Sequence, residues 1–255
     1  MTVRNASGQA GAVQLSRVRE MRKAVRFRDL TPELINVELQ VHTTWTDGRA
    51  TIAEVLETAC QRGLAVVAFT EHVRRETDWF ADFADAVRKE ARRFPELTVL
   101  VGCEAKALNA GGGLDVSDEV RAQCDIVLGS VHRFPDGRGG LLDFNKVDRE
   151  TFAELECDLA VGLLLGAPID VLAHPGGMYQ RLHGQYPDAL FRRMIEASLG
   201  RGIAVEINSS YLAEPEPFLA LCEELNPFVS IGSDAHTREE IGRCRDMLIS
   251  SQRFA

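Results

Sequence analysis

The sequence has no long apolar run and no paired cysteines, and each absence excludes a class of protein. No stretch approaches the about 18 consecutive apolar residues that a membrane-spanning helix needs, and the first residues lack the apolar core of a signal peptide. The six cysteines are scattered without a CxxC pair, so neither a zinc knuckle nor a disulfide framework is indicated. We therefore expect a cytoplasmic protein with buried free thiols and no membrane partner.

Positive charge is scarce as well, since 29 Lys and Arg face 38 Asp and Glu and give a net charge of -9. An extended nucleic-acid surface needs a clustered positive field, so the sequence argues against one, whereas a small phosphorylated substrate is compatible with this charge. No G-x-S-x-G motif and no positioned Cys/His arrangement indicates a side-chain nucleophile.

The length and composition suit a single domain. A chain of 255 residues with 45% hydrophobic residues can form one barrel-sized domain, and no linker marks a second. We expect that domain to span residues 31–255. Residues 1–30 would be an N-terminal extension, in which the apolar spacing over residues 13–28 predicts a helix packed outside the barrel.

The most informative pattern is the recurrence of ionisable residues at the ends of apolar runs. The run over residues 37–41 alternates with the period of a half-buried strand and leads into His42 and then Asp47. Successive run ends lie 28 to 42 residues apart, which suits strand-helix-strand units. Six further runs end in this way, and their polar ends are Glu71 with His72, Glu104, His132, His174, Glu206 with Asn208, and Asp234 with His236.

Seven βα units predict an α/β barrel of parallel strands whose carboxyl ends converge on one mouth. Helical patterns are expected over residues 51–62, 79–87, 189–199, 214–225 and 239–250. The segments over residues 133–146 and 175–188 follow two of the strand ends and are expected to be loops that shape the mouth.

Five histidines and several carboxylates at one mouth are more than a general acid and base require, and they suit two or three divalent metal ions. Imidazoles mixed with carboxylates favour Zn, Mn or Fe over Ca or Mg. Neighbouring metals can activate a hydroxide as the nucleophile and hold the oxygens of a phosphoryl group. The pattern therefore favours metal-dependent hydrolysis.

The order of the motifs QVHTTWTDG, FTEH, GCE, GSVH, AHPGG and GSDAH resembles that of the polymerase and histidinol phosphatase (PHP) family. The likeness covers about residues 36–240. It implies a distorted TIM-like (β/α)7 barrel with a metal cluster, commonly of three ions, at the C-terminal ends of the strands, and it implies phosphoesterase chemistry.

The resemblance also implies a role for each motif residue. One metal would be held by His42, Glu104 and Asp234, a second by Glu104, His132 and His174, and a third by Asp47, His72 and His236. Glu104, Asp234 and His236 are the expected catalytic residues.

Gln40 stands where the family has the first His of H-x-H, and its amide oxygen is a poorer zinc ligand than an imidazole. The first metal site would therefore be weak, prefer Mn or stay empty. Glu71 replaces the usual Asp of T-D-H and is expected to support His72.

Several cations stand one or two residues beyond the expected ligands, and a phosphate ester needs such partners. The candidates for substrate binding are Arg133, Arg74, Arg75 and Lys106. The leading interpretation is a phosphomonoesterase acting on a small phosphorylated metabolite, of which the family name suggests histidinol phosphate.

Two alternatives belong to other classes. A nuclease acting on nucleotides or short oligonucleotides would need stacking aromatics at the mouth, with Trp45, Phe134 and Tyr179 as candidates. A non-catalytic metal-binding protein would follow if Gln40 had abolished the catalytic metal site.

Overall fold

The computed structural model describes residues 23–136, 140–251 and 253, and its centre is one curled sheet. Seven strands run parallel, each neighbouring the next along the chain: β2 (Val37–Val41), β3 (Val66–Val73), β4 (Thr98–Lys106), β5 (Ile126–Ser130), β6 (Val171–Leu172), β7 (Ala204–Asn208) and β8 (Phe228–Gly232). This order confirms the predicted distorted (β/α)7 barrel.

The barrel closes only at the carboxyl ends of its first and last parallel strands. A single bridge joins Val41 to Ala235, where the amide of His42 donates to the carbonyl of Ala235 at 2.9 Å and the amide of Ala235 donates to that of Gln40 at 3.0 Å. The closure therefore lies at the end of the barrel where the ionisable residues gather.

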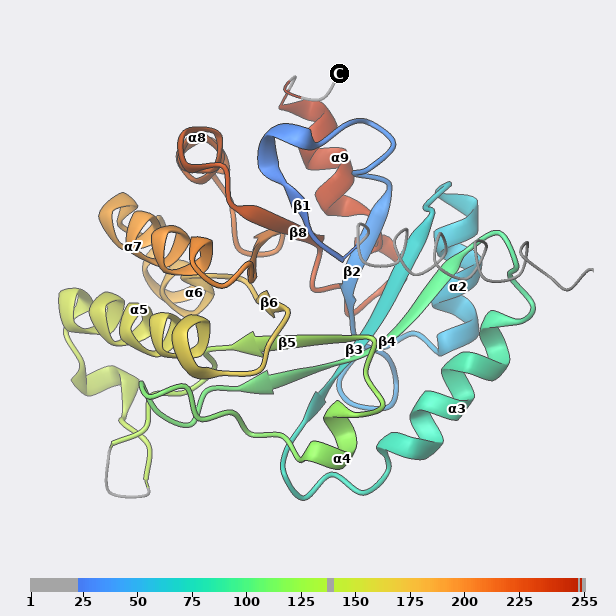
Figure 1. Cartoon of the computed structure of the whole chain (residues 1–255), viewed down its shortest axis with the longest axis horizontal. Coiled ribbons are helices and arrows are strands. Elements are labelled where there is room, and N and C mark those ends of the chain that lie inside the picture. Colours follow the sequence, from blue (N-terminus) through green and yellow to red (C-terminus); the bar gives the residue numbers. More distant parts are fainter. Residues whose placement is uncertain (1–22, 137–139, 252, 254–255) are drawn as a thin grey trace, which may run out of the picture.

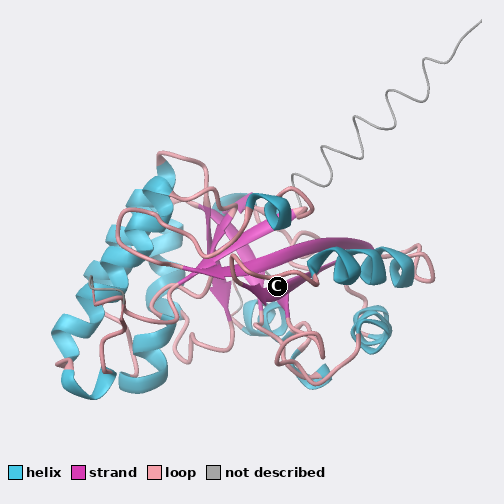
Figure 2. Ribbon diagram, turned by 90° about the horizontal axis from the view of Figure 1, so that it is seen from below, coloured by secondary structure: helices cyan, strands magenta, loops and turns pink. Residues whose placement is uncertain are grey.

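Helices cover the outside of the sheet, with α2 and α3 on one side and α5, α6 and α7 on the other (Figures 1 and 2). Their bounds are α2 (Ile52–Gln61), α3 (Phe80–Ala91), α4 (Asp118–Arg121), α5 (Arg149–Gly166), α6 (Gly177–His183), α7 (Asp188–Leu199), α8 (Glu216–Leu225) and α9 (Arg243–Ser250). Short 3-10 helices span Phe27–Asp29, Phe144–Lys146 and Arg238–Glu240.

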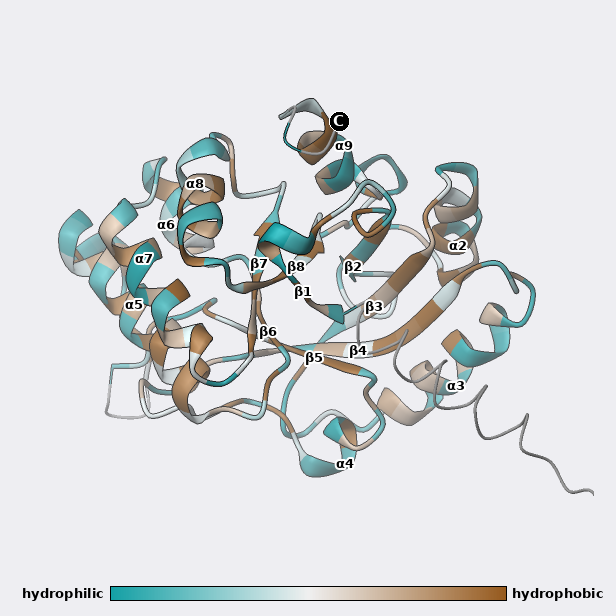
Figure 3. Cartoon of the chain, turned by 45° about the horizontal axis from the view of Figure 1, so that its top comes forward, coloured by the Kyte–Doolittle hydropathy of each residue, from teal (hydrophilic) through white to brown (hydrophobic). Residues whose placement is uncertain are grey.

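The first helix shows how local sequence sets these elements. Thr51 and Glu54 form a capping box at the start of α2, and Ile52, Val55 and Leu56 of its apolar stripe are buried against the sheet. Figure 3 shows the same division more widely, with β3 and β4 largely hydrophobic and the surrounding helices of mixed hydropathy. No helix in the described ranges is both long and apolar enough to cross a membrane.

The predicted helix over residues 13–28 is wrong for residues 25–28, whereas Lys23 is helical and residues 13–22 lie outside the described residues. Val25 and Arg26 form β1, which pairs antiparallel with β8, and Phe27 begins a 3-10 helix. Burial of Phe27 and packing of the Arg26 guanidinium on the ring of Phe228, 4.1 Å from its centroid, favour this extended conformation over a helix. The sheet thus begins before the expected boundary at residue 31.

A second difference concerns the segment after His174, which was expected to be a loop. It contains α6, which begins after Gly176 in the left-handed region, with φ of 72°. Both oxygens of Glu156 on α5 accept backbone N–H groups of this helix, from Met178 at 2.9 Å and Tyr179 at 2.8 Å. A long-range acceptor therefore stabilises a helix that its two leading glycines disfavour.

Candidate metal centre and substrate cavity

The ends of six parallel strands bring eight ionisable side chains into one cluster. It contains His42 and Asp47 after β2, His72 on β3, Glu104 on β4, His132 after β5, His174 after β6, and Asp234 and His236 after β8. The predicted convergence of these residues is what the structure shows.

Glu104 lies at the centre of this cluster and is 2% exposed. Its Oε2 atom lies 3.3 Å from His42 Nε2 and 3.1 Å from His72 Nδ1. Its Oε1 atom lies 3.0 Å from His132 Nε2 and 2.9 Å from His174 Nε2. A carboxylate with two histidines at each oxygen is placed to bridge two metal ions.

Buried atoms without partners test whether metal ions fit here. Both ring nitrogens of His42, Oε2 of Glu104 and Oδ1 of Asp234 are buried and form no hydrogen bond with any described residue. Yet His42 Nε2 lies only 3.0 Å from Asp234 Oδ1. Leaving such atoms unpaired costs about 1–3 kcal/mol each. A cation among them would satisfy all three side chains, so the donor set fits a divalent metal.

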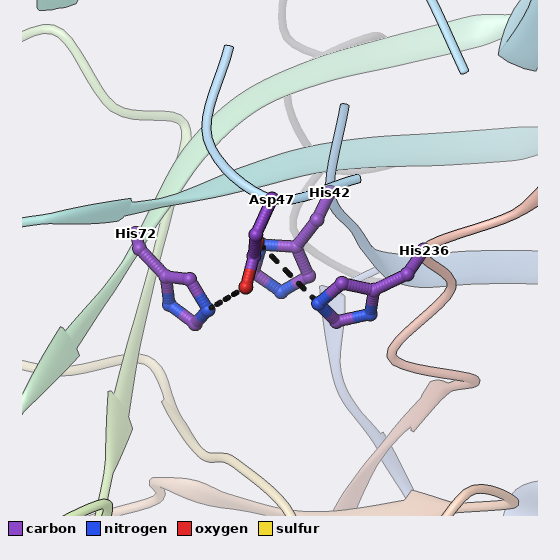
Figure 4. Close-up of side chains that lie close together, drawn as sticks. All are labelled: His42, Asp47, His72 and His236. Atoms are coloured by element: carbon purple, nitrogen blue, oxygen red, sulfur yellow. Dashed lines mark ion pairs between the residues drawn. The ribbon is translucent and has the colours of Figure 1, made fainter. Parts of the chain in front are cut away.

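A second group lies at the more exposed edge of the cluster, around Asp47 (Figure 4). Its carboxylate lies 3.4 Å from His72 Nε2 and 3.4 Å from His236 Nε2, and 3.9 Å from His42 Nδ1. The Nδ1 atom of His236 lies 2.8 Å from the backbone carbonyl of Asp234. If that nitrogen carries the proton, Nε2 has a free lone pair directed at this group.

The charges of the cluster depend strongly on one another. Burial alone would lower the pKa of His42 and His174, but the neighbouring carboxylates outweigh it, raising the pKa of His42 well above its usual value and that of His174 to about 9. Burial would raise the pKa of Glu104, but the histidines, above all His132, hold it well below its usual value. The metal-free cluster thus binds protons where metal ions would bind, and metal loading releases them.

Two members of the cluster have an unusual backbone. His174, with φ of 27°, and Asp234, with φ of 50°, adopt positive φ, which side chains with a Cβ rarely do. Such conformations persist where the surroundings impose them, and they gather at functional sites. Here each directs its side chain toward the buried centre.

Further polar groups hold the cluster in place without belonging to it. Glu71 accepts hydrogen bonds from the amide of Thr43 at 2.9 Å and from the hydroxyls of Thr43 and Thr46, so it supports the segment between His42 and Asp47. The hydroxyl of Tyr211 donates to Asp234 Oδ2 at 3.1 Å, and its ring lies 4.7 Å from that of His174. Glu71 was predicted to support His72, and its hydrogen bonds go to Thr43 and Thr46 instead, whereas no role was predicted for Tyr211.

Gln40 is fully buried inside the barrel, and its amide is engaged elsewhere. Its Oε1 atom accepts from Asn208 Nδ2 at 3.0 Å, and the same nitrogen donates to Glu206 at 2.9 Å. Glu206 also accepts the backbone N–H of His174 at 2.7 Å. The structure thus places Gln40 in a hydrogen-bonded chain that ends at a metal-ligand candidate.

The cluster forms the floor of a cavity of about 1190 Å³. Of the cations expected to bind substrate, Arg74, Lys106 and Arg133 line it, whereas Arg75 does not. Three further arginines that the sequence analysis missed also line it: Arg49, Arg181 and Arg243. Tyr211 stands three residues beyond the β7 strand end and could have been found by that position, but Arg181 and Arg243 lie on helices and carried no such signal.

The aromatic residues considered for base stacking are mostly unavailable. Phe134 is 1% exposed and packs on Phe144 and Phe152, and Tyr179 is 4% exposed and accepts a hydrogen bond from Arg149. Trp45 is 37% exposed and lies against Trp79, outside the residues that line the cavity. None of the three aromatic residues predicted for base stacking therefore forms a platform at this mouth.

Comparisons with known proteins agree with this geometry. The chain is 27% identical over 237 residues to the DNA polymerase/3'-5' exonuclease PolX of Bacillus subtilis (strain 168), with 87% of the chain covered but only 39% of that relative. It is 24% identical over 224 residues to a protein of Caldicellulosiruptor bescii named probable phosphatase, covering 82% of the chain and 83% of the relative.

A solved structure shares the fold. It is the histidinol phosphate phosphatase of Lactococcus lactis subsp. lactis Il1403, complexed with zinc, L-histidinol and phosphate, with a TM-score of 0.67 and 16% identity over 86% of this chain and 94% of that one. The PHP domain family matches residues 38–210, which include most of the strand-end motifs. Since that match spans well over half of the sequence, the chain belongs to the PHP domain family.

Proposed function

We propose that this PHP-family phosphoesterase hydrolyses phosphate monoesters of small metabolites, with divalent metal ions held by the strand-end cluster. The observation that carries the proposal is the Glu104 carboxylate, buried with two histidines at each of its oxygens beneath a cavity that arginines line. Its two ends favour adjacent metal sites, as a hydrolytic cluster requires.

The residues divide into three groups of ligands. His42, Glu104 and Asp234 would hold one ion, Glu104, His132 and His174 a second, and Asp47, His72 and His236 a third. The first and third sets match groups whose atoms lie close enough to share an ion. Zn, Mn or Fe suits this mixture of imidazole and carboxylate, and such ions would supply Lewis acidity and a water of lowered pKa as the nucleophile.

The remaining side chains bind and orient the ester. Arg74 and Arg133 follow β3 and β5 and line the cavity. Neither guanidinium group forms a hydrogen bond or ion pair with any described residue, and that of Arg133 lies 5.9 Å from the centroid of the Phe144 ring. Both guanidinium groups are therefore available to bind phosphoryl oxygens. Lys106 is less available, because it pairs with Asp115 at 3.2 Å.

The test is a panel of phosphomonoesters assayed with Mn- or Zn-loaded protein. We expect hydrolysis that is lost, by about a thousandfold or more, in a His174→Ala variant, since this removes a ligand near both Glu104 and His132. Absence of any turnover above that of His174→Ala contradicts the proposal.

Arg74 and Arg75 provide a matched pair for the binding residues. Both are exposed arginines at the end of β3, but only Arg74 lines the cavity. We expect Arg74→Gln to raise KM by about tenfold, the loss of one charged hydrogen bond, and Arg75→Gln to leave kcat/KM within about twofold. Equal losses in the two variants would show a general effect of surface charge instead of binding.

A further inference from the structure

Positive charge is concentrated in the cavity although the chain as a whole is acidic, with a net charge of -9. Of the four acidic residues that line it, Asp47, Glu104 and Asp234 belong to the metal cluster, and Glu240 is held by the backbone amides of His236 and Thr237. The basic residues that line it are Arg49, Arg74, Lys106, Arg133, Arg181 and Arg243. With metal ions bound, this cavity is strongly positive.

Five of the six basic residues fall into two sets on opposite arcs of the barrel, and the sixth, Arg49, lies between β2 and α2. Arg74, Lys106 and Arg133 follow the adjacent strands β3, β4 and β5. Arg181 lies on α6, after β6, and Arg243 begins α9, after β8. The phosphoryl group at the metal cluster can use the first set, which leaves the second without a role in the proposed reaction.

The second set is built around the end of β7. The Arg243 guanidinium donates to the hydroxyls of Ser210, at 2.5 Å, and Ser209, at 3.4 Å. Its only ion pair with a described residue, to Glu240, is 3.8 Å long. Ser210 in turn donates to the carbonyl of Ser233, which fixes the position of the arginine. The group is therefore oriented in advance but not neutralised.

Arg181 completes this set from the other side. Its guanidinium forms no hydrogen bond or ion pair with any described residue. Arg181 and Tyr211 line the same cavity. Ser210 and Tyr211 also line the cavity, so Arg181, Arg243, Ser210 and Tyr211 form one patch, which we call the β7-side cluster.

We propose that the β7-side cluster binds a second anionic group of the substrate, a phosphate or carboxylate, while the metal cluster binds the phosphoryl group that is removed. The inference rests on the proposed function, whose substrate class it narrows. A volume of about 1190 Å³ is larger than a single phosphoryl group needs and accommodates both groups. The guanidinium groups of Arg181 and Arg243 lack a close carboxylate partner among the described residues, so they favour binding of a phosphate or carboxylate.

The same charge disfavours a substrate with a cationic leaving group. Histidinol phosphate carries an ammonium group, which the arginines that line the cavity would repel. We expect this ester to be a poorer substrate than a phosphate ester of similar size that carries a carboxylate.

The experiment compares pairs of esters that differ by one anionic group. Suitable pairs are glycerol 3-phosphate with 3-phosphoglycerate, and fructose 6-phosphate with fructose 1,6-bisphosphate. For the metal-loaded parent we expect kcat/KM to be at least about tenfold higher for the doubly anionic member, which is the contribution of one charge-assisted hydrogen bond. A ratio near one in both pairs overturns the inference.

Variants of the β7-side cluster test whether its arginines cause the preference for the doubly anionic ester. Arg181→Gln and Arg243→Gln are expected to lower that ratio by about fivefold or more each, whereas Arg92→Gln, an exposed arginine at the end of α3 outside the cavity, preserves it. Metal content and melting temperature of each variant show that it is folded. An unchanged ratio in both cluster variants also overturns the inference.

Failure of the inference can be told apart from failure of the proposed function. If both members of a pair are hydrolysed with equal kcat/KM, the proposed phosphomonoesterase activity is supported and the second anion site is rejected. If no ester is hydrolysed, the second anion site is tested by binding instead. The dissociation constants of fructose 6-phosphate and fructose 1,6-bisphosphate for the same protein are measured by calorimetry. Tighter binding of the bisphosphate that is lost in Arg181→Gln supports the site, and equal binding rejects it.

Discussion

At the scale of single residues, the orientation of the Gln40 amide follows from its neighbours. Asn208 Oδ1 accepts the backbone N–H of Ser210 at 2.9 Å, so its NH2 group faces Glu206 and Gln40. Gln40 must then direct its oxygen to Asn208, and its buried NH2 group has no hydrogen-bond partner among the described residues. A donor in that position repels a cation, so Gln40 supports the barrel interior better than it binds metal.

Replacement of Gln40 tests this assignment directly. We expect Gln40→Ala to keep the parent's metal content, measured by elemental analysis after loading, and to lower the free energy of unfolding by about 1–3 kcal/mol, because the Asn208 amide loses its acceptor. Glu104→Gln is the control that loses metal. Loss of one metal equivalent in Gln40→Ala would identify the glutamine as a ligand.

The hydroxyl of Tyr211 orients the candidate metal ligand Asp234. Removing its hydrogen bond to Asp234 in Tyr211→Phe should weaken metal binding by about tenfold, measured by competition with a chelator. Tyr186→Phe is the matched control, since the Tyr186 hydroxyl donates to the carbonyl of Ala153, away from the cluster. Equal affinities of the two variants would show that Tyr211 does not position Asp234.

The candidate site could be predicted as far as strand ends determine it. Apolar runs in the sequence placed His42, Glu104 and Asp234 at one mouth, because parallel strands end at one side of a barrel. The bond from Gln40 to Asn208 could not be predicted, since it joins residues 168 positions apart. Arg243 was missed for the same reason, because its place in the cavity depends on Ser209 and Ser210 of another element.

At the scale of elements, the long helix α5 positions the segment after His174. Glu156 is 1% exposed, and burial raises its pKa to about 7 although the amides of Tyr179 and Met178 oppose the shift. A raised pKa means that this group favours folding fully below about pH 4.5, its ordinary value, and loses that contribution as the pH rises through about 7.

We therefore expect the free energy of unfolding of the metal-free protein to fall as the pH rises. Between about pH 4.5 and 7, denaturant unfolding should show a decline in the free energy of unfolding of up to ~3 kcal/mol from Glu156, and Glu156→Gln should lack it. Parallel pH profiles of the parent and the variant would contradict this assignment.

The elements themselves were predictable where periodicity and caps agree. The helix expected over residues 51–62 appears as α2, because its apolar stripe and its capping box act within one segment. The pattern before residue 31 predicted a helix where β1 forms, because pairing with β8 and burial of Phe27 outweigh local spacing. The helix α6 depends on Glu156, more than 20 positions earlier, and local sequence could not indicate it.

At the scale of the whole molecule, an acidic exterior surrounds a basic cavity. Small anions are attracted into the cavity, while a polyanion too long to enter meets a chain of net charge -9. This contrast in charge favours binding of small anionic metabolites over binding of nucleic acids, although PolX, a longer relative, is named as an exonuclease.

Competition experiments distinguish the two kinds of anion. At about 50 mM salt, inorganic phosphate should inhibit turnover of a small phosphomonoester competitively, whereas a single-stranded DNA of about 20 nucleotides should change the rate by less than about twofold and remain uncleaved. Phosphate inhibition should weaken as salt is raised, because the cavity cations are partly exposed. Cleavage of the oligonucleotide at rates similar to those of the ester would favour the nuclease.

The closure of the barrel also determines when, during synthesis of the chain, the metal sites can be completed. His42 comes from the first parallel strand and Asp234 and His236 from beyond the last, and the bridge from Val41 to Ala235 joins those strands. A chain still on the ribosome thus carries His42, His72 and Glu104 long before the residues that complete their sites. The two proposed sites that include Asp234 or His236 can therefore be completed only after nearly the whole barrel has been synthesised, and a chain truncated before β8 would lack both those sites and the closing bridge.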